Sequence, residues 1–180
     1  MAGYNLFVIS GIDGCFDEFD GFYENRLVLK PTQKLQYDRN QTFIENVAKM
    51  RQVINSFPKL TPKVIVGWSI GAAAAAFLSD CNSVETCIMI NSFYCRKEVL
   101  KRRNIECDED VCLEDSYRLA PCYVIIRGEL DDKIPPIHSD RIRAMYPPSV
   151  TEFHSFPLAK HNISSFPIEK IASIINNKIK

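Results

Sequence analysis

The stretch Gly67-Trp68-Ser69-Ile70-Gly71 places a serine between an apolar run, Val64 to Val66, and an alanine-rich run, Ala72 to Ala76. An apolar run, a glycine-flanked turn and a run of strong helix formers predict a strand, a sharp turn and a helix, in that order. The two glycines let the backbones of the strand and the helix pass close together. We therefore expect Ser69 at a sharp turn, with its hydroxyl at the carboxyl end of a strand and beside the positive end of a helix.

Length and composition indicate one domain spanning residues 1–180 with a full hydrophobic core. The apolar content of 46% and charged content of 24% are ordinary, and the formal net charge is zero. A neutral chain has no global field that attracts nucleic acid or a membrane surface, so neither is expected as a partner. The sequence shows no apolar run of membrane-spanning length and no signal sequence, which predicts a cytoplasmic protein without a membrane span.

The seven cysteines do not follow the spacing of a disulfide framework or a zinc site. Their number is odd, no C-x-x-C occurs, and they lie at positions 15, 81, 87, 95, 107, 112 and 122. Cys87 and Cys122 stand in apolar strand contexts and are interpreted as small core residues. No metal and no cofactor is expected.

Apolar runs alternate with segments of helical periodicity along the whole chain. Strands are predicted over residues 6–9, 27–29, 64–66, 87–90, 123–126 and 150–156, and helices over residues 41–57, 70–79, 139–145 and 163–179. This alternation predicts an α/β fold, a three-layer sandwich in which a mostly parallel sheet of about six strands carries helices on both faces.

Residues 92–120 interrupt the alternation with a long polar insertion. Its first half is basic and its second half is acidic, and helical structure is predicted over residues 97–103 and 112–119. Connections longer than about 15 residues are usually functional or mobile.

Two motifs resemble those of one family. The G-x-S-x-G pattern between a strand and a helix resembles the nucleophile elbow of α/β-hydrolases. Gly128-x-x-Asp131-x-x-Ile134-Pro135, directly after a predicted strand, is similar to the acid loop of esterases and thioesterases of that family. The resemblance implies a compact α/β-hydrolase fold and a serine hydrolase that cleaves a carboxylic ester or thioester through an acyl-enzyme. It also implies that the insertion at residues 92–120 is lid-like, because members of the family often carry a lid after the strand beyond the elbow.

A serine hydroxyl needs a base to accept its proton and an acid to orient that base. The family order of serine, acid and histidine implies Ser69 as nucleophile, Asp131 as acid and His161 as base. Asp132 is adjacent to Asp131 and is an alternative acid. His161 follows the last predicted strand, where the family carries its base, and the other two histidines, His138 and His154, are interpreted as ordinary surface or core residues.

The resemblance also implies an oxyanion hole of two backbone N–H groups. One belongs to Ile70, the residue after the nucleophile. The other belongs to Ile12, in the loop after the first strand, where many members carry His-Gly and this chain carries Ser10-Gly11.

The substrate is less constrained than the reaction. Trp68, Phe93 and Tyr94 are candidate binding residues, and with Val99, Leu100 and Leu113 they either line an acyl pocket or simply cover the core. The basic half of the insertion is either a docking site for an acyl carrier protein or coenzyme A, or a solvated helix face. Gly-Trp-Ser resembles the elbow of esterases that act on pimeloyl-carrier-protein methyl ester in biotin synthesis.

Two other readings stay open at this point. The chain is alternatively a non-catalytic protein with the hydrolase fold that binds an acyl ligand or a partner. A doubly wound binding domain unrelated to hydrolases is a weaker hypothesis, because the sequence contains neither G-x-G-x-x-G nor a phosphate-binding loop.

Overall fold

The computed structural model describes residues 3–12, 26–106, 109–116 and 122–179. Its centre is a sheet of six parallel strands in the order β2-β1-β3-β4-β5-β6. The strands are β1 (Asn5–Ile9), β2 (Gln33–Leu35), β3 (Lys63–Trp68), β4 (Val84–Ile90), β5 (Cys122–Gly128) and β6 (Thr151–Phe156). All six therefore end at one edge of the sheet, and the loops that follow β1, β3, β5 and β6 meet there.

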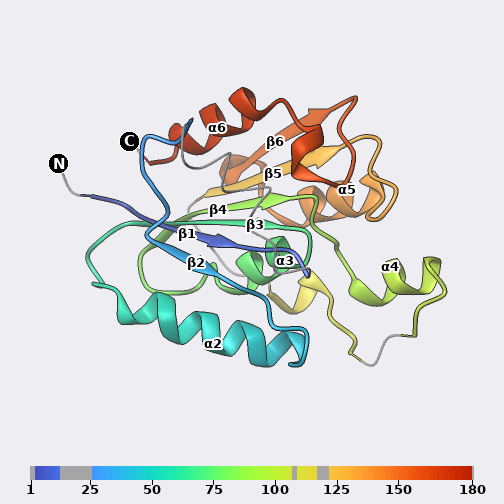
Figure 1. The fold of residues 1–180 in the computed structure, drawn as a ribbon, viewed down its shortest axis with the longest axis horizontal. Helices are drawn as coiled ribbons and strands as arrows, with labels where there is room; N and C mark the ends of the chain where they lie inside the picture. The colour runs from blue at the N-terminus through green and yellow to red at the C-terminus, as the bar shows by residue number, and fades with distance from the viewer. Residues whose placement is uncertain (1–2, 13–25, 107–108, 117–121, 180) are drawn as a thin grey trace.

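Helices cover both faces of the sheet, as Figure 1 shows, with α6 on one side and α2 on the other. The helices are α2 (Phe43–Ser56), α3 (Ile70–Phe77), α4 (Arg96–Arg102), α5 (Pro136–Met145) and α6 (Ile168–Asn176), with short 3₁₀ turns at Leu113–Ser116, Pro148–Val150 and Ile163–Ser165. The predicted three-layer α/β sandwich is confirmed. None of the described helices is long and apolar enough to cross a bilayer.

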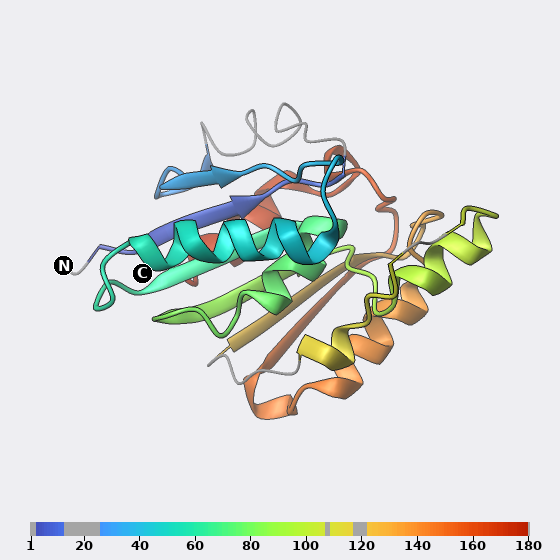
Figure 2. The same cartoon turned by 90° about the horizontal axis from the view of Figure 1, so that it is seen from below.

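Alternate residues of the strands supply two separate cores, because successive side chains in a strand point to opposite faces. On one face, strand residues such as Phe7, Ile65 and Met89 pack against α2, α3 and α5, which Figure 2 shows together in front of the sheet. On the other face, residues such as Val8, Val66 and Ile126 pack against α6. The strands are apolar on both faces because both faces are buried.

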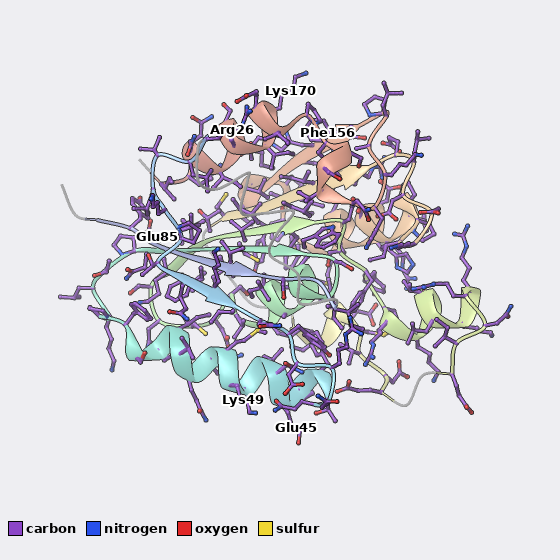
Figure 3. All side chains as sticks on the ribbon, viewed as in Figure 1. Arg26, Glu45, Lys49, Glu85, Phe156 and Lys170 are labelled. Atoms are coloured by element: carbon purple, nitrogen blue, oxygen red, sulfur yellow. A yellow bond between two sulfur atoms is a disulfide. The ribbon has the colours of Figure 1, made fainter. Side chains whose placement is uncertain are left out.

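Helix α2 is amphipathic and has a well-defined start. The Thr42 hydroxyl accepts a hydrogen bond from the backbone N–H of Glu45, and the Glu45 carboxylate accepts one from the backbone N–H of Thr42. This capping box satisfies two N–H groups that the first turn leaves unpaired. The side chains of Glu45 and Lys49 project outward from the helix into solvent, as Figure 3 shows.

Two predicted elements are wrong in position. The strand expected over residues 27–29 is irregular, and β2 starts at Gln33, after Thr32 pairs with Leu6. Pro31 lacks a backbone N–H, so the ladder cannot extend back through it. The helix expected from residue 163 starts at Ile168, because Pro167 holds the preceding Phe166 extended, at φ −83° and ψ 153°.

The insertion also departs from expectation. Cys95 and Cys112 form an isolated antiparallel bridge and a disulfide, which the sequence analysis did not expect. Helix α4 confirms the first predicted helical segment. A 3₁₀ turn at Leu113–Ser116 occupies part of the second, and its residues 117–119 lie outside the described residues. Cys87 is fully buried in the core, as predicted, and burial raises the pKa of its thiol.

Candidate active site

Ser69 lies in a sharp turn between β3 and α3, with φ 58° and ψ −121°. A positive φ in a residue with a side chain is strained, and it persists here because the neighbours fix the turn. A Cβ at Gly67 would come within 2.1 Å of the Gly71 carbonyl oxygen, and a Cβ at Gly71 within 2.3 Å of that of Ser10. The predicted close passage of strand and helix is therefore present, and only glycine fits at both positions.

His161 lies in the loop after β6 and faces Ser69. Its Nε2 is 3.1 Å from Ser69 Oγ, and its Nδ1 is 2.8 Å from Asp131 Oδ2. The imidazole thus connects a hydroxyl on one ring nitrogen with a carboxylate on the other. His161 and Asp131 are buried, whereas Ser69 is partly exposed, so this series of three hydrogen-bonded side chains reaches solvent at the Ser69 hydroxyl.

Asp131 lies in the turn after β5, and its own backbone neighbours hold its carboxylate. Oδ1 accepts hydrogen bonds from the backbone N–H groups of Lys133 (2.9 Å) and Ile134 (2.8 Å), which leaves Oδ2 for His161. Asp132, the alternative acid, is exposed, and His161 is not its partner. Local turn geometry therefore directs the Asp131 carboxylate toward the imidazole.

The loop after β5, which carries Asp131, and the loop after β6, which carries His161, are bonded to each other. The backbone N–H of Leu130 donates to the Ala159 carbonyl at 2.9 Å, and that of Glu129 donates to the Phe156 carbonyl at 3.0 Å. A Cβ at Gly128 would lie 2.4 Å from the Ala159 carbonyl oxygen, so only glycine allows this approach. The distance between His161 and Asp131 is fixed by the two loops packing as one unit.

Asn91, which the sequence analysis did not single out, joins three of these segments. It follows β4 and is almost fully buried, at φ 48°. Its Nδ2 donates to the carbonyl oxygens of Lys160 and His161, each at 3.0 Å, and its Oδ1 accepts from the N–H of Gly128 at 2.9 Å. The Asn91 side chain therefore links the end of β4 to β5 and to the loop that carries His161.

Trp68 completes the support of the histidine loop. Its indole Nε1 donates to the His161 carbonyl at 2.9 Å, and the centres of its ring and the imidazole are 5.5 Å apart. The residue before Ser69 thus holds the backbone of His161. The sequence makes Trp68 a candidate substrate-binding residue, and the structure adds this contact with the His161 backbone.

The two predicted oxyanion donors border the same space as the Ser69 hydroxyl. Ile70 is the first residue of α3, and Ile12 follows β1. Within the described part of the chain, no protein acceptor takes the backbone N–H of either residue. Both amides are therefore available to a ligand atom.

A cavity of about 370 Å³ opens beside Ser69. Trp68, Phe93, Val99 and Leu100 give it an apolar wall, and Gly11, Ile12, Ile70 and Ile134 also line it. Tyr94 and Leu113 are not among the residues that line this cavity. The Tyr94 ring instead lies under the guanidinium of Arg141, 3.8 Å from its carbon.

The other two histidines lie outside this arrangement. His154 is on β6 with Nε2 2.6 Å from a Glu152 carboxylate oxygen. His138 is buried in α5, where its Nδ1 accepts from the backbone N–H of Tyr94 at 3.3 Å, and burial lowers its pKa. Neither is bonded to Ser69 or Asp131 in the described residues.

Among the described residues, one group of metal-ligand type comes together, namely Cys95, Asp110 and Cys112. Its two sulfurs are joined as a disulfide. The site at Ser69 holds instead a hydroxyl, an imidazole and a carboxylate in series. That series is suited to proton transfer during attack on an acyl carbonyl.

No model of a protein family matches the chain, and no curated protein matches it in sequence. Solved structures are similar in fold. Est1E from Butyrivibrio proteoclasticus has a TM-score of 0.74 at 11% identity, covering 99% of this chain and 88% of its own. Acyl-protein thioesterase 2 from Zea mays has 0.65 at 14%, covering 100% and 95%.

A third similar structure is described as an alpha/beta hydrolase. MGS-MChE2, described as an alpha/beta hydrolase enzyme from the metagenome of sediments of the Mar Chica lagoon in Morocco, has a TM-score of 0.67 at 14% identity. The match covers 97% of this chain and 90% of that one. At such identities the similarity shows the fold, over nearly the whole chain. The protein has the α/β-hydrolase fold.

Proposed function

We propose that the protein is a serine hydrolase that cleaves a carboxylic ester or thioester through an acyl-enzyme. The observation that carries this proposal is the series Asp131–His161–Ser69, with distances of 2.8 Å and 3.1 Å between successive partners. The strained Ser69 turn and the low-identity similarity to esterase and thioesterase structures support it.

In the first half-reaction, Ser69 Oγ attacks the acyl carbonyl carbon while His161 Nε2 accepts the hydroxyl proton. Asp131 holds the Nδ1 proton, fixes the tautomer and stabilises the imidazolium that forms. The backbone N–H groups of Ile70 and Ile12 bind the oxygen on which negative charge develops. As the tetrahedral intermediate collapses, the bond to the leaving group breaks, and His161 gives its proton to that group.

In the second half-reaction, water attacks the acyl-enzyme. His161 accepts a proton from the water, and the oxyanion forms in the same place as before. When the bond to Ser69 Oγ breaks, His161 returns the proton to the serine and the carboxylic acid leaves. Nothing in this cycle calls for a metal or an organic cofactor.

The proposal extends to the insertion and the substrate. Residues 92–120 act as a lid on a single hydrolase domain, because α4 supplies part of the cavity wall and stands beyond the carboxyl ends of the strands (Figure 1). A cavity of about 370 Å³ suits a small acyl group. The finer hypothesis is pimeloyl-carrier-protein methyl ester in cytoplasmic biotin synthesis, with an acyl carrier protein as partner, and its support is the Gly-Trp-Ser sequence and the basic α4.

The test uses a fluorophosphonate probe and a panel of p-nitrophenyl esters, acyl-coenzyme A thioesters and carrier-protein esters. We expect labelling at Ser69, and in Ser69→Ala a loss of about 10³-fold or more in kcat with the fold retained. Ser56→Ala, at the exposed end of α2, is the matched control and keeps full activity. Folded wild-type protein that is not labelled, or a Ser69→Ala variant as active as wild type, would contradict the proposal.

A further inference from the structure

The cavity beside Ser69 is locally cationic in a protein whose formal net charge is zero. Arg96, Arg103 and Lys133 line it, and the set of lining residues contains no aspartate or glutamate. Asp131, two residues before Lys133, is buried behind His161 and bonded to it, and the exposed Asp132 is not among the residues that line the cavity. Among the described residues, a ligand in the cavity therefore meets positive charge and no acidic side chain.

The three cations are not equivalent. Arg96 is neutralised, because its guanidinium lies 2.8 Å from a Glu109 carboxylate oxygen and both side chains are mostly buried. In the described part of the chain, neither Arg103 nor Lys133 forms an ion pair with a carboxylate. The charge that remains for a ligand is that of Arg103 and Lys133.

These two side chains come from different segments of the site. Arg103 follows the last turn of α4, near the middle of the insertion. Lys133 lies two residues after Asp131, and its backbone N–H is fixed on the Asp131 carboxylate. The turn of Asp131 and the insertion thus each bring to this cavity one cation that pairs with no carboxylate of the residues that the structure describes.

We propose that the substrate of this site carries an anionic group, a carboxylate or a phosphate, which Arg103 and Lys133 bind while Ser69 attacks the ester carbonyl. The inference rests on the proposed hydrolase function and narrows its substrate class. Arg103 supplies a planar donor pair that matches either anion, and Lys133 supplies a point charge. Because both side chains are exposed, we expect a preference of about 3- to 30-fold in kcat/KM for a charged over a neutral substrate.

The experiment has two arms, since the anion resides either in the acid half or in the leaving group. Monomethyl glutarate is compared with dimethyl glutarate by pH-stat, and butyryl-coenzyme A with S-butyryl-N-acetylcysteamine by thiol release. We expect the charged member to be preferred in one arm. The preference falls in Arg103→Gln and in Lys133→Gln and falls further in the double variant, because kcat/KM for the charged member drops more than kcat/KM for the neutral member.

The control is Arg102→Gln, which removes an exposed charge from the same helix at a residue that does not line the cavity. If Arg103 and Lys133 bind the anion directly, Arg102→Gln keeps the preference for the charged substrate. In wild type, rising salt concentration weakens that preference. Equal kcat/KM for charged and neutral members in both arms would overturn the inference, and so would an equal loss in Arg102→Gln.

A binding measurement separates this inference from the proposed function. Calorimetric titration of Ser69→Ala with glutarate and with coenzyme A reports the anion site without any turnover. Binding that is lost in the Arg103→Gln, Lys133→Gln double variant supports the site even if wild type cleaves none of the esters. If neither anion binds and no ester pair shows a preference, the anion site is refuted, whether or not Ser69 is nucleophilic.

Discussion

Replacing Asn91 by aspartate tests whether one buried amide holds the site together. The change keeps the shape of the side chain and the acceptor for the Gly128 N–H, but removes both N–H donors. It places a carboxylate oxygen where Nδ2 now lies 3.0 Å from the Lys160 and His161 carbonyl oxygens. Aspartate also tolerates the left-handed backbone at φ 48°, so the perturbation is confined to the side chain.

The expected loss follows from the contacts. Two buried hydrogen bonds are removed at about 1 to 1.5 kcal/mol each, and two carbonyl oxygens then face a desolvated carboxylate, which adds about 1 kcal/mol or more. We expect the free energy of unfolding to fall by about 3 to 4 kcal/mol. With a urea slope of about 2 kcal/mol per molar, the midpoint falls by about 1.5 to 2 M. The loss is smaller at low pH, where a protonated carboxyl donates one hydrogen bond.

The assays are urea unfolding and the hydrolysis of p-nitrophenyl acetate under conditions where the variant is folded. We expect kcat to fall together with the free energy of unfolding, because the Asn91 side chain holds both β5 and the loop that carries His161. Asn55→Asp, on the exposed side of α2, is a matched control that changes neither quantity by much. A stability loss below about 1 kcal/mol, together with an unchanged kcat, would refute the reasoning.

Three further outcomes are expected. Gly71→Ala loses at least about 2 kcal/mol in urea unfolding, because its Cβ meets the Ser10 carbonyl oxygen at 2.3 Å, and a loss below about 0.5 kcal/mol would contradict this. Burial lowers the folded-state pKa of His138, so its contribution to stability is present above about pH 6.5 and is lost as the pH falls toward that lowered pKa. Urea midpoints between pH 7.5 and 5.5 check this, with a flatter profile expected in His138→Asn. Cys112→Ser breaks the bridge to Cys95 and loses about 3 kcal/mol, and a reductant destabilises wild type but not the variant.

The sequence predicts those parts of the site whose geometry depends on a few consecutive residues. The Ser69 turn requires glycines two residues before and two after it, and the Asp131 turn bonds its own carboxylate to residues two and three positions later. Parallel strands then bring both turns, and His161, to one edge of the sheet. The catalytic roles of these three residues stay proposals, but their positions follow from local chemistry and strand order.

The parts that the sequence missed depend on contacts between distant segments. Asn91 bonds to residues 69 and 70 positions away, and nothing in its own neighbourhood distinguishes it from an ordinary loop asparagine. The best signal is its place directly after a buried strand. Tyr94 has the same kind of sequence context as Phe93, yet it packs under Arg141, because α5 comes close to it. Short polar strands such as β2 are recognised only once a neighbouring edge is known.

The single tryptophan of the chain has an optical consequence. Trp68 is mostly buried, its indole N–H is bonded to the backbone carbonyl of His161, and it forms part of the cavity wall. Indole emission responds to the polarity and hydrogen bonding of its surroundings, and here one fluorophore senses only this place. Excitation at the red edge of the absorption band therefore reads the site directly, without a label. Binding of a ligand in the cavity beside Ser69 is therefore expected to change the emission of Trp68.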